Sequence, residues 1–414
     1  MSQTAKVSSS QLDLFSTVLH SYSAKNSGVM SNQSLYEEVA SMQGLSDEEL
    51  NSKIPIGKDG ALHNPFKRKI RWQQQTLRAA GILEHVDGQQ GIWQLTAPAS
   101  KDLNKISGTV SVIGFSTDLG IAILGCCETV FASIDAPISL VVTSPPFPLA
   151  VPRNYGNVPE AQYVDWICKT LAPVIKNLAP GGSICINLSN DIFLSGSPAR
   201  SIYRERLVIA LIDRFGLWKM DELIWENKSK PPGPIRYASI DRTQLNVVYE
   251  PIYWFTNDPS CVNSNNRRVL QAHSERHLKL IKQGGERRQA LSADGAYGVK
   301  HGSYGNQTEG RIPRNILSFG HRCPAQTAYK LAAKAMGLPV HGAPMPLKLA
   351  SFLIEFMSEP GQLVVDPFAG SFTTLDAAQR LGRRWIGTEC MVEYVMGAAS
   401  RFVAADGFNN RLAA

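Results

Sequence analysis

The stretch TSPPF, residues 143–147, contains residue types that could take part in binding or catalysis. It follows the apolar run ISLVV, residues 138–142. Two consecutive prolines cannot donate hydrogen bonds to a neighbouring strand, so strand pairing ends there. The carbonyl groups of Ser144 and Pro145 are then held rigidly without neighbouring donors. Because the ring of Phe147 adds a flat apolar surface, the stretch suits the binding of a planar group that carries an amine.

A second stretch that could bind a ligand is LVVDPFAGSFTTLDAAQRLG, residues 363–382. An apolar strand leads into Asp366, a turn containing Gly370, and a helix expected to begin near Thr373. Ligands of open α/β sheets lie at such strand ends, where Asp366 can accept from an ammonium group and helix N–H groups can bind a carboxylate. About twenty residues later, RRWIGTE ends in Glu389, the expected place for an acid that accepts from ribose hydroxyls. An adenosyl amino acid fits all three features. A phosphate-binding loop does not, because no lysine follows the glycine.

The segments that must position these residues alternate between strand and helix patterns. The predicted strands are SLVVTS, SICINLS, DELIWE, PIYWFT, QLVVDPF and RRWIGTE. The predicted helices are EAQYVDWICKTLAPVIKNLAP, which Gly181-Gly182 should end, and SIYRERLVIALIDRFG. This alternation predicts an α/β fold with helices on both faces of one sheet.

Residues 257–330 interrupt the alternation and are rich in Asn, Gly, Ser, His and Arg. Residues 267–322 contain eleven Lys and Arg against four acidic residues. A long irregular insertion within a compact domain usually has a function, with a flexible surface loop as the alternative.

The N-terminal region has a different organisation. Residues 1–30 are rich in Ser, Asn and Gln and are expected to be flexible, whereas residues 31–100 read as helices followed by a hairpin, LEHVDGQQGIWQLT. LSDEEL predicts a capping box between Ser46 and Glu49. This order suggests a winged helix-turn-helix, and the basic residues of NPFKRKIRWQQQTLRAAGIL either follow DNA phosphates or form a solvated face. The region resembles the N-terminal winged-helix domain of Mrr-type restriction proteins, which favours DNA contact, although some such domains contact proteins.

Composition limits the remaining possibilities. The 414 residues include 42 Lys and Arg and 35 Asp and Glu, a formal charge of +7 that suits a polyanionic partner. None of the seven cysteines forms a C-x-x-C pair, so neither a zinc site nor a disulfide framework is indicated. The N-terminus has no apolar signal core and no stretch is long enough to span a membrane, so a cytoplasmic location, associated with the nucleoid, is expected.

TSPPF and DPFAGSFTT together strongly resemble amino-methylating DNA methyltransferases, which use S-adenosylmethionine. The target-base motif precedes the cofactor motif, which is the β-type order of that family. The resemblance covers roughly residues 105–402 and is especially close to cytosine-N4 enzymes of restriction-modification systems across RNYGN, YVDW, PGGS, PARSIY and IWENKSKPPGPI. It implies a Rossmann-like sheet with a catalytic half at 105–256, a target recognition region at 257–330 and a cofactor-binding half at 331–414.

The resemblance also assigns roles to residues. The Ser144 side chain and the Pro145 carbonyl would accept hydrogen bonds from the exocyclic amine of a flipped base, and Phe147 would stack on that base. Transfer would be a direct displacement favoured by positioning and electrostatics. The predicted catalytic residues are Ser144, Pro145, Pro146 and Phe147. The predicted cofactor-binding residues are Thr143, His341, Asp366, Pro367, Phe368, Ala369, Gly370, Ser371, Thr373 and Glu389. The predicted DNA-binding residues are Lys67, Arg68, Lys69, Arg71, Arg267, Arg268, Arg287, Arg288, Arg311 and Arg314.

Some features depart from the family pattern or leave alternatives open. Cys126 stands where the family usually has an Asp that contacts the adenine of the cofactor. Ser144 favours cytosine as the target, with adenine close behind, because adenine enzymes more often carry Asp at that position. The alternatives are a DNA-binding regulator with a vestigial methyltransferase fold and a methylase of RNA or of a glutamine side chain. A homodimer and a partner restriction endonuclease are further expectations from the resemblance.

Overall fold

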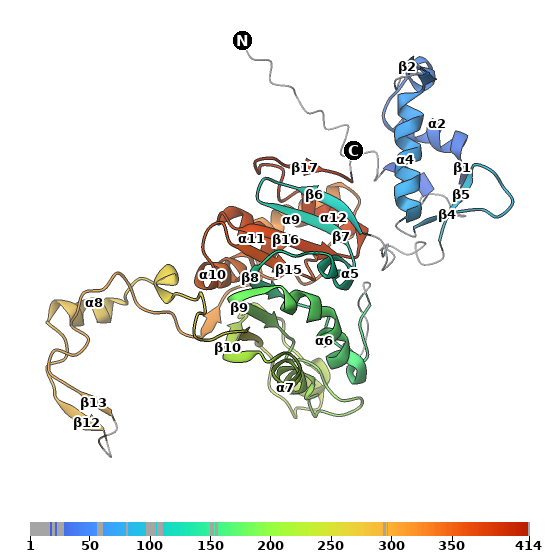
Figure 1. Ribbon diagram of the computed structural model, residues 1–414. Helices are drawn as coiled ribbons and strands as arrows, with labels where there is room; N and C mark the ends of the chain where they lie inside the picture. Colours follow the sequence, from blue (N-terminus) through green and yellow to red (C-terminus); the bar gives the residue numbers. More distant parts are fainter. Residues whose placement is uncertain are drawn as a thin grey trace, which may run out of the picture.

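The computed structural model describes residues 17–18, 21–22, 29–55, 61–79, 82–96, 105, 111–149, 153, 156–292, 295 and 297–412. Within these residues the chain forms a small N-terminal unit, a large α/β domain and an arm that projects from that domain (Figure 1).

The N-terminal unit combines helices with a three-stranded antiparallel sheet in the order β1-β5-β4. The predicted capping box is confirmed, because the Ser46 side chain accepts from the Glu49 N–H and the Glu49 side chain accepts from the Ser46 N–H. Val18 and Tyr22 are fully buried, and the Tyr22 hydroxyl accepts from Gln74 Nε2 at 2.9 Å, so they pack with this unit although the sequence placed them in a flexible segment. Its elements are β1 (Val29–Ser31), α2 (Asn32–Met42), α3 (Asp47–Asn51), β2 (Ile54–Pro55), β3 (Leu62–His63), α4 (Pro65–Ala79), β4 (Leu83–His85) and β5 (Ile92–Leu95).

The large domain is built on a ten-stranded sheet of order β14-β10-β11-β9-β8-β15-β16-β7-β6-β17 among the described residues. The five central strands, from β9 to β7 in that order, are parallel to one another. The strands are β6 (Ser111–Ser116), β7 (Gly120–Gly125), β8 (Ile138–Thr143), β9 (Leu178–Asn187), β10 (Trp218–Glu226), β11 (Tyr249–Thr256), β14 (Ile316–Ser318), β15 (Leu363–Asp366), β16 (Arg384–Glu389) and β17 (Asn409–Asn410). The predicted α/β fold is confirmed.

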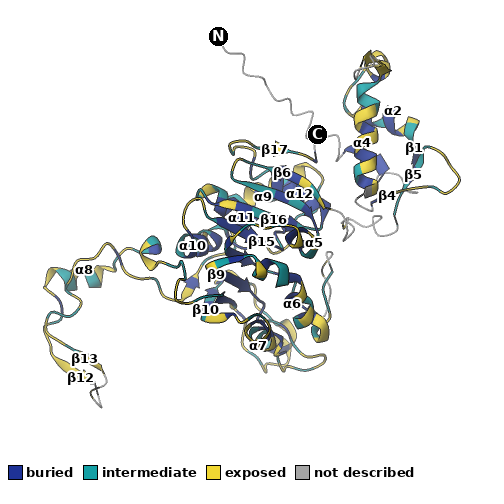
Figure 2. Cartoon of the chain, in the orientation of Figure 1, coloured by how far each residue is buried: buried dark blue, intermediate teal, exposed yellow. Residues whose placement is uncertain are grey.

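Successive residues of a strand point to opposite faces of the sheet, and the buried strands carry apolar residues at both sets of positions. Both faces are therefore apolar, and helices cover both. Val141 and Val365 pack in the core beneath one set of helices, whereas Leu140 and Val364 pack beneath the other. The first set is α5 (Cys127–Ala132), α6 (Glu160–Lys176) and α7 (Tyr203–Phe215), and the second is α10 (Leu347–Met357), α11 (Thr373–Arg380) and α12 (Val392–Ala399), which α9 (Pro324–Ala335) contacts. Figure 2 shows the buried strands in dark blue between these layers.

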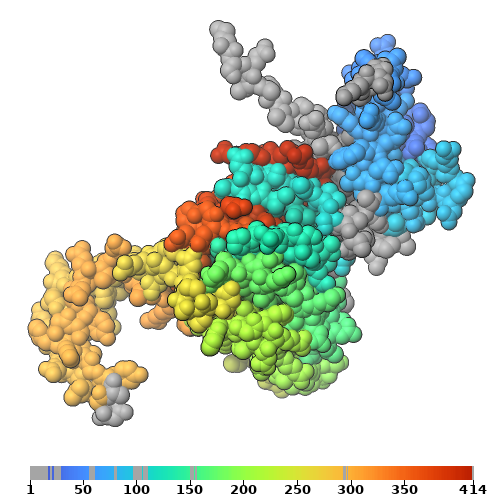
Figure 3. Space-filling view, viewed as in Figure 1, coloured from blue at the N-terminus to red at the C-terminus, as the bar shows by residue number. Residues whose placement is uncertain are grey.

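Within the insertion predicted at 257–330, the part before β14 forms the arm, which projects from the domain in Figure 3. The remainder of that range belongs to the domain, because Ile316–Ser318 is strand β14 of the sheet and residues 324–330 are part of α9. The central part of the arm is mostly exposed (Figure 2). Its elements are η4 (Asn266–Val269), α8 (Glu275–Lys282) and the hairpin β12 (Ala290–Ser292) and β13 (Tyr297–Val299). The chain leaves the sheet after β11 and returns to it at β14, which pairs with β10. A short π-helix, η3 (Ile235–Ile240), follows β10.

One local prediction was wrong. The helix α6 ends at Lys176 rather than at Gly181-Gly182, and both glycines lie within β9. A Cβ atom at Gly181 would lie 2.1 Å from the Cys261 carbonyl oxygen, so glycine is required there by close contact between two backbone segments. Glycine permits either role, and the sequence alone does not distinguish them.

Candidate functional site

The predicted catalytic and cofactor-binding motifs meet at one edge of the sheet. Parallel strands present their carboxyl ends on the same side, which is where ligands bind in such sheets. The central strands end there at Gly125, Thr143, Asn187, Asp366 and Glu389. Motifs separated by more than two hundred residues are therefore brought together by the β8–β15 pairing.

Asp366 is buried at the centre of this edge, with 4% of its surface exposed. Its Oδ1 atom accepts from Thr143 Oγ1 at 2.7 Å and from the Phe368 N–H at 3.1 Å. Burial raises the pKa of Asp366 to about 6, although these hydrogen bonds partly oppose the rise. A carboxylate held in this way gains from a cationic partner, because a nearby positive charge favours its ionised form.

The turn after β15 holds Glu389 through backbone donors. The Gly370 N–H donates to Glu389 Oε2 at 2.9 Å, and the N–H groups of Cys390 and Met391 donate to Oε1, each at 2.8 Å. Burial raises the pKa of Glu389. The two carboxyl groups thus sit at the ends of adjacent strands and are joined through one turn.

His341 closes over that turn. Gly370 has φ of +50°, and a Cβ atom there would lie 2.9 Å from His341 Nε2, so both conformation and space favour glycine. The His341 ring packs edge-on against Tyr394 at 4.8 Å between ring centroids. Burial, with the charges of Arg153 and Arg401, lowers the pKa of His341 to about 4 and keeps the imidazole neutral at pH 7.

The TSPPF segment begins where β8 ends. Ser144 Oγ donates to Asn187 Oδ1, at the end of β9, at 3.3 Å. Pro145 is buried, whereas Ser144, Pro146 and Phe147 are partly exposed. Phe147 packs against the core formed with α6 and α7. The segment starts beside Asp366, because Thr143, its first residue, donates to that carboxylate.

The rest of the turn is fixed on β16 and α6. Pro367 O accepts from Thr388 Oγ1 at 2.8 Å, and the Ala369 N–H donates to Thr388 O at 2.9 Å. The Phe368 ring lies 5.6 Å from the Trp166 ring, between centroids. These contacts hold the turn against β16 and α6.

Two residues that the sequence analysis missed anchor the end of the turn. Gln326 Nε2 donates to Thr373 Oγ1 at 3.0 Å, and Arg401 Nε donates to Ser371 O at 2.7 Å. Arg401 also pairs with Asp376 at 3.3 Å, with both side chains 3% exposed. Ser371 and Thr373 are thus engaged in the support of the turn. No local pattern marks Gln326 or Arg401, because Gln326 comes from α9 and Arg401 from the turn after α12, both separated from the motif in the sequence by further elements.

Cys126 lies just beyond β7, at the position where the family pattern has an acid. Its thiol is half-buried, and a hydrogen bond from Cys127 is the main reason that the pKa of Cys126 is lowered to about 6. Burial and that same hydrogen bond raise the pKa of Cys127. The thiolate form of Cys126 is therefore favoured relative to an ordinary cysteine.

The predicted DNA-binding residues lie on α4 and on the arm. Arg68, Lys69 and Arg71 are exposed on α4, and Lys67 donates to Asn51 Oδ1 at 2.9 Å. The arm exposes its predicted arginines, namely Arg267, Arg287, Arg288, Arg311 and Arg314.

Arg268 is the exception among these arginines. Its guanidinium donates to Asn263 O at 3.0 Å and to Ser358 O at 3.1 Å, and pairs with Glu359 at 2.7 Å. These contacts fasten the base of the arm to the end of α10, so we leave Arg268 out of the DNA-contact set.

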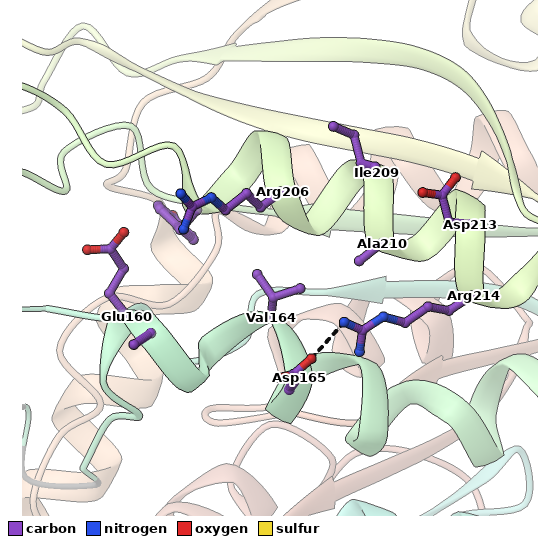
Figure 4. Close-up of a pocket in the computed structure, with 10 residues that line it drawn as sticks. Glu160, Val164, Asp165, Arg206, Ile209, Ala210, Asp213 and Arg214 are labelled. Atoms are coloured by element: carbon purple, nitrogen blue, oxygen red, sulfur yellow. Dashed lines mark ion pairs between the residues drawn. The ribbon is translucent and has the colours of Figure 1, made fainter.

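A shallow groove of about 390 Å³ lies elsewhere, between α6 and α7 (Figure 4). An ion pair between Arg214 and Asp165, at 2.7 Å, crosses it. None of the predicted catalytic or cofactor-binding residues lines this groove. Its apolar part is formed by Ala161, Val164, Ile209 and Ala210.

Two further observations concern other classes of site. No helix among the described residues has the length and apolar character needed to cross a membrane. In the same part of the chain, no group of three or more His, Cys, Asp or Glu side chains is arranged to hold a metal ion.

Comparison with known proteins agrees with this geometry. Residues 138–400 match the model of a DNA methylase family, N6_N4_Mtase, and residues 13–105 match the Mrr N-terminal domain. The chain is 35% identical over 269 residues to the Type II methyltransferase M.PvuII of Proteus hauseri, covering 65% of this chain and 79% of that protein. It is 24% identical over 378 residues to M.BamHI of Bacillus amyloliquefaciens, covering 88% and 72%. The solved structure of the PvuII DNA methyltransferase, described as cytosine-N4-specific, matches with a TM-score of 0.54 and 31% identity over 70% of this chain and 88% of that one.

The chain therefore belongs to the N6_N4_Mtase family of DNA methylases. It is an S-adenosylmethionine-dependent DNA amino-methyltransferase with an Mrr-like N-terminal domain. The residues at the sheet edge fit that cofactor, because Asp366 offers an acceptor to an ammonium group and Glu389 is placed as an acceptor for ribose hydroxyls. This family membership decides against the alternatives, namely a DNA-binding regulator with a vestigial methyltransferase fold and a methylase of RNA or of a glutamine side chain.

Proposed function

We propose that this enzyme methylates the N4 atom of cytosine at a specific site in duplex DNA. Ser144, in the first variable position of the catalytic motif, favours cytosine over adenine. The similarity to the M.PvuII methyltransferase supports this choice, since that structure is described as cytosine-N4-specific. A DNA adenine methyltransferase of Escherichia coli, YhdJ, is a weaker match at 24% identity.

The observation that carries the proposal is the position of the Ser144 hydroxyl, which donates its proton to Asn187. Ser144 directly follows Thr143, the last residue of β8, whose hydroxyl donates to Asp366. A lone pair of Ser144 Oγ and the Pro145 carbonyl then accept from the two N–H groups of the target amine. The amine nitrogen is weakly nucleophilic because its lone pair is delocalised into the ring. Two fixed acceptors favour a tetrahedral nitrogen and direct its lone pair out of the ring plane.

Phe147 supplies the stacking surface for a base that leaves the duplex, a step that costs a few kcal/mol. Asp366, Glu389 and the Gly370 turn bind S-adenosylmethionine, which supplies the methyl group when bound. Thr143 orients Asp366 through its 2.7 Å hydrogen bond. His341, neutral at pH 7, adds no positive charge beside the sulfonium.

The DNA is bound by two basic surfaces. The exposed arginines of the arm contact the target region, and Arg68, Lys69 and Arg71 of α4 contact flanking phosphates. The protein forms a homodimer and is associated with the nucleoid. A restriction endonuclease is its partner in a restriction-modification system. The similarity to Type II methyltransferases supports the endonuclease partner.

The test is nucleoside mass spectrometry after incubation of purified enzyme, tritiated S-adenosylmethionine and bacterial DNA from a strain without methylases. We expect N4-methyldeoxycytidine as the labelled product. N6-methyldeoxyadenosine as the sole product would overturn the choice of base and leave the transfer mechanism standing. Long-read sequencing of the same DNA gives the recognition site.

A further inference from the structure

The hydroxyl group of Ser144 has one proton and two lone pairs, so it can either donate to or accept from a neighbour. For Ser144 to act as an acceptor for an amine, its own proton must be committed elsewhere. Ser144 Oγ donates to Asn187 Oδ1 at 3.3 Å. The identity of the Asn187 atom that faces Ser144 therefore decides which role the hydroxyl takes.

The orientation of the Asn187 amide is set from the other side. Asn187 is 3% exposed, and its Nδ2 donates to Pro251 O, on β11, at 3.3 Å. The same amide lies near the Glu250 carboxylate and acts to lower the pKa of that carboxyl. A carbonyl and a carboxylate are both acceptors, so the NH₂ group must face β11 and the oxygen must face Ser144.

Glu250 is in turn held in place by Lys230. The two side chains lie 3.7 Å apart, between Lys230 Nζ and Glu250 Oε1, and are 22% and 20% exposed. Burial raises the pKa of Glu250, while the charge of Lys230 opposes the rise and favours the ionised carboxylate. In its ionised form, which Lys230 favours, the carboxylate can only accept, and this keeps the Asn187 NH₂ group turned toward it.

Resting on the proposed role of Ser144, we propose that Asn187, Glu250 and Lys230 are positioning residues that make the Ser144 hydroxyl an obligate acceptor for the target amine. Lys230 neutralises Glu250, Glu250 and Pro251 O fix the Asn187 amide, and Asn187 Oδ1 takes the Ser144 proton. A lone pair of Ser144 Oγ is thereby left for the base. None of the three needs to touch the substrate.

The first experiment measures the single-turnover rate of methyl transfer at saturating DNA and S-adenosylmethionine. Asn187→Leu keeps the side-chain size but loses both hydrogen-bonding functions, and we expect a rate roughly tenfold lower or more, with unchanged cofactor affinity. Asn257→Leu is the matched control, because Asn257 also donates to two backbone carbonyls, Leu178 O and Ala179 O, at the opposite end of β9. We expect this control to keep the wild-type rate.

A double-mutant cycle then separates positioning from general support of the fold. Ser144→Asp introduces a carboxylate that accepts without help, so adding Asn187→Leu to it should lower the rate by less than about threefold. An equal loss in both backgrounds would overturn the inference. Full activity of Ser144→Ala would instead overturn the proposed role of Ser144 itself, so the two failures are distinguishable.

A second pair of variants gives an answer even where Ser144→Asp is inactive. Asn187→Asp keeps the acceptor for Ser144 but sets two carboxylates against each other, and should lower the rate. Combining it with Glu250→Gln restores one donor to that contact, and the rate should recover to within roughly threefold of wild type. If the double variant is slower than either single one, Asn187 and Glu250 do not act through each other and the inference fails.

Discussion

Replacing Asp366 with asparagine should stabilise the cofactor-free protein while weakening its binding of S-adenosylmethionine by about tenfold or more. The amide keeps an oxygen that can accept from Thr143 Oγ1 and from the Phe368 N–H, as the carboxylate does. It removes the negative charge that burial disfavours. A shift of the Asp366 pKa from 3.8 to about 6 means that ionising this carboxyl costs the cofactor-free folded state about 3 kcal/mol at neutral pH, at about 1.4 kcal/mol per pH unit.

The sign of the pH dependence follows from the raised pKa. The folded wild-type protein binds the Asp366 proton more tightly than the unfolded chain does, so wild-type stability rises as the pH falls from about 6 toward 3.8. The advantage of Asp366→Asn is therefore fully present above pH 7 and absent below pH 4. For a domain of this size it corresponds to roughly 5 °C in Tm at pH 7.5.

Differential scanning calorimetry of the cofactor-free proteins, at pH 7.5 and near pH 4, measures the difference in Tm between Asp366→Asn and the wild type. The relevant unfolding transition is the one that S-adenosylmethionine shifts in the wild type. Titration calorimetry at pH 7.5 should show cofactor affinity lower by about tenfold or more, because a charge-assisted hydrogen bond is lost. Asp376→Asn is the control, since Asp376 is equally buried but paired with Arg380 and Arg401, and it should destabilise the protein. Stabilisation of Asp366→Asn that persists at pH 4, or none at pH 7.5, would refute the desolvation argument.

Three further predictions follow from the site and the basic surfaces. Ser144→Ala and Phe147→Ala should each abolish methyl transfer yet bind S-adenosylmethionine with wild-type affinity by titration calorimetry; loss of cofactor binding would contradict the assignment of these residues to the base. Replacing Arg68, Lys69 and Arg71 together with alanine should weaken DNA binding and lower the slope of log affinity against log salt by about 0.9 per lost phosphate contact, whereas an unchanged slope would indicate a protein-contact role for α4. Cys126 should react with iodoacetamide at neutral pH faster than the exposed Cys261, because the pKa of Cys126 is lowered whereas a hydrogen bond to Asp258 raises the pKa of Cys261. Mass spectrometry that finds Cys261 labelled first would contradict this.

Local patterns in the sequence predicted the parts of the site that are contiguous in the chain. TSPPF and the Asp366 turn each have a strand, a break and a polar side chain in sequence, so their form follows from the backbone chemistry of proline and glycine. Their proximity required only that both strands be parallel and central, which the alternation of strands and helices implied.

The supporting residues could not be found in this way. Asn187, Gln326 and Arg401 act through side-chain contacts with residues far away in the sequence, and their own neighbourhoods resemble ordinary strand and helix ends. Arg268 illustrates the converse, because its charge suggested DNA contact while the fold uses it to hold two backbone segments together. A sequence shows which residues are charged, but it does not show which groups those residues contact in the folded protein.

The arm has both of its ends tied to the catalytic domain. The Asn265 N–H donates to Phe356 O at 2.8 Å near its start, and β14 pairs with β10 at its end. The segment between Arg268, which also contacts the end of α10, and β14 can change in length or sequence without altering the β8–β15 pairing. Under the proposed DNA-binding role of the arm, exchange of this one continuous segment would change the recognition sequence while leaving the methyl-transfer residues unchanged.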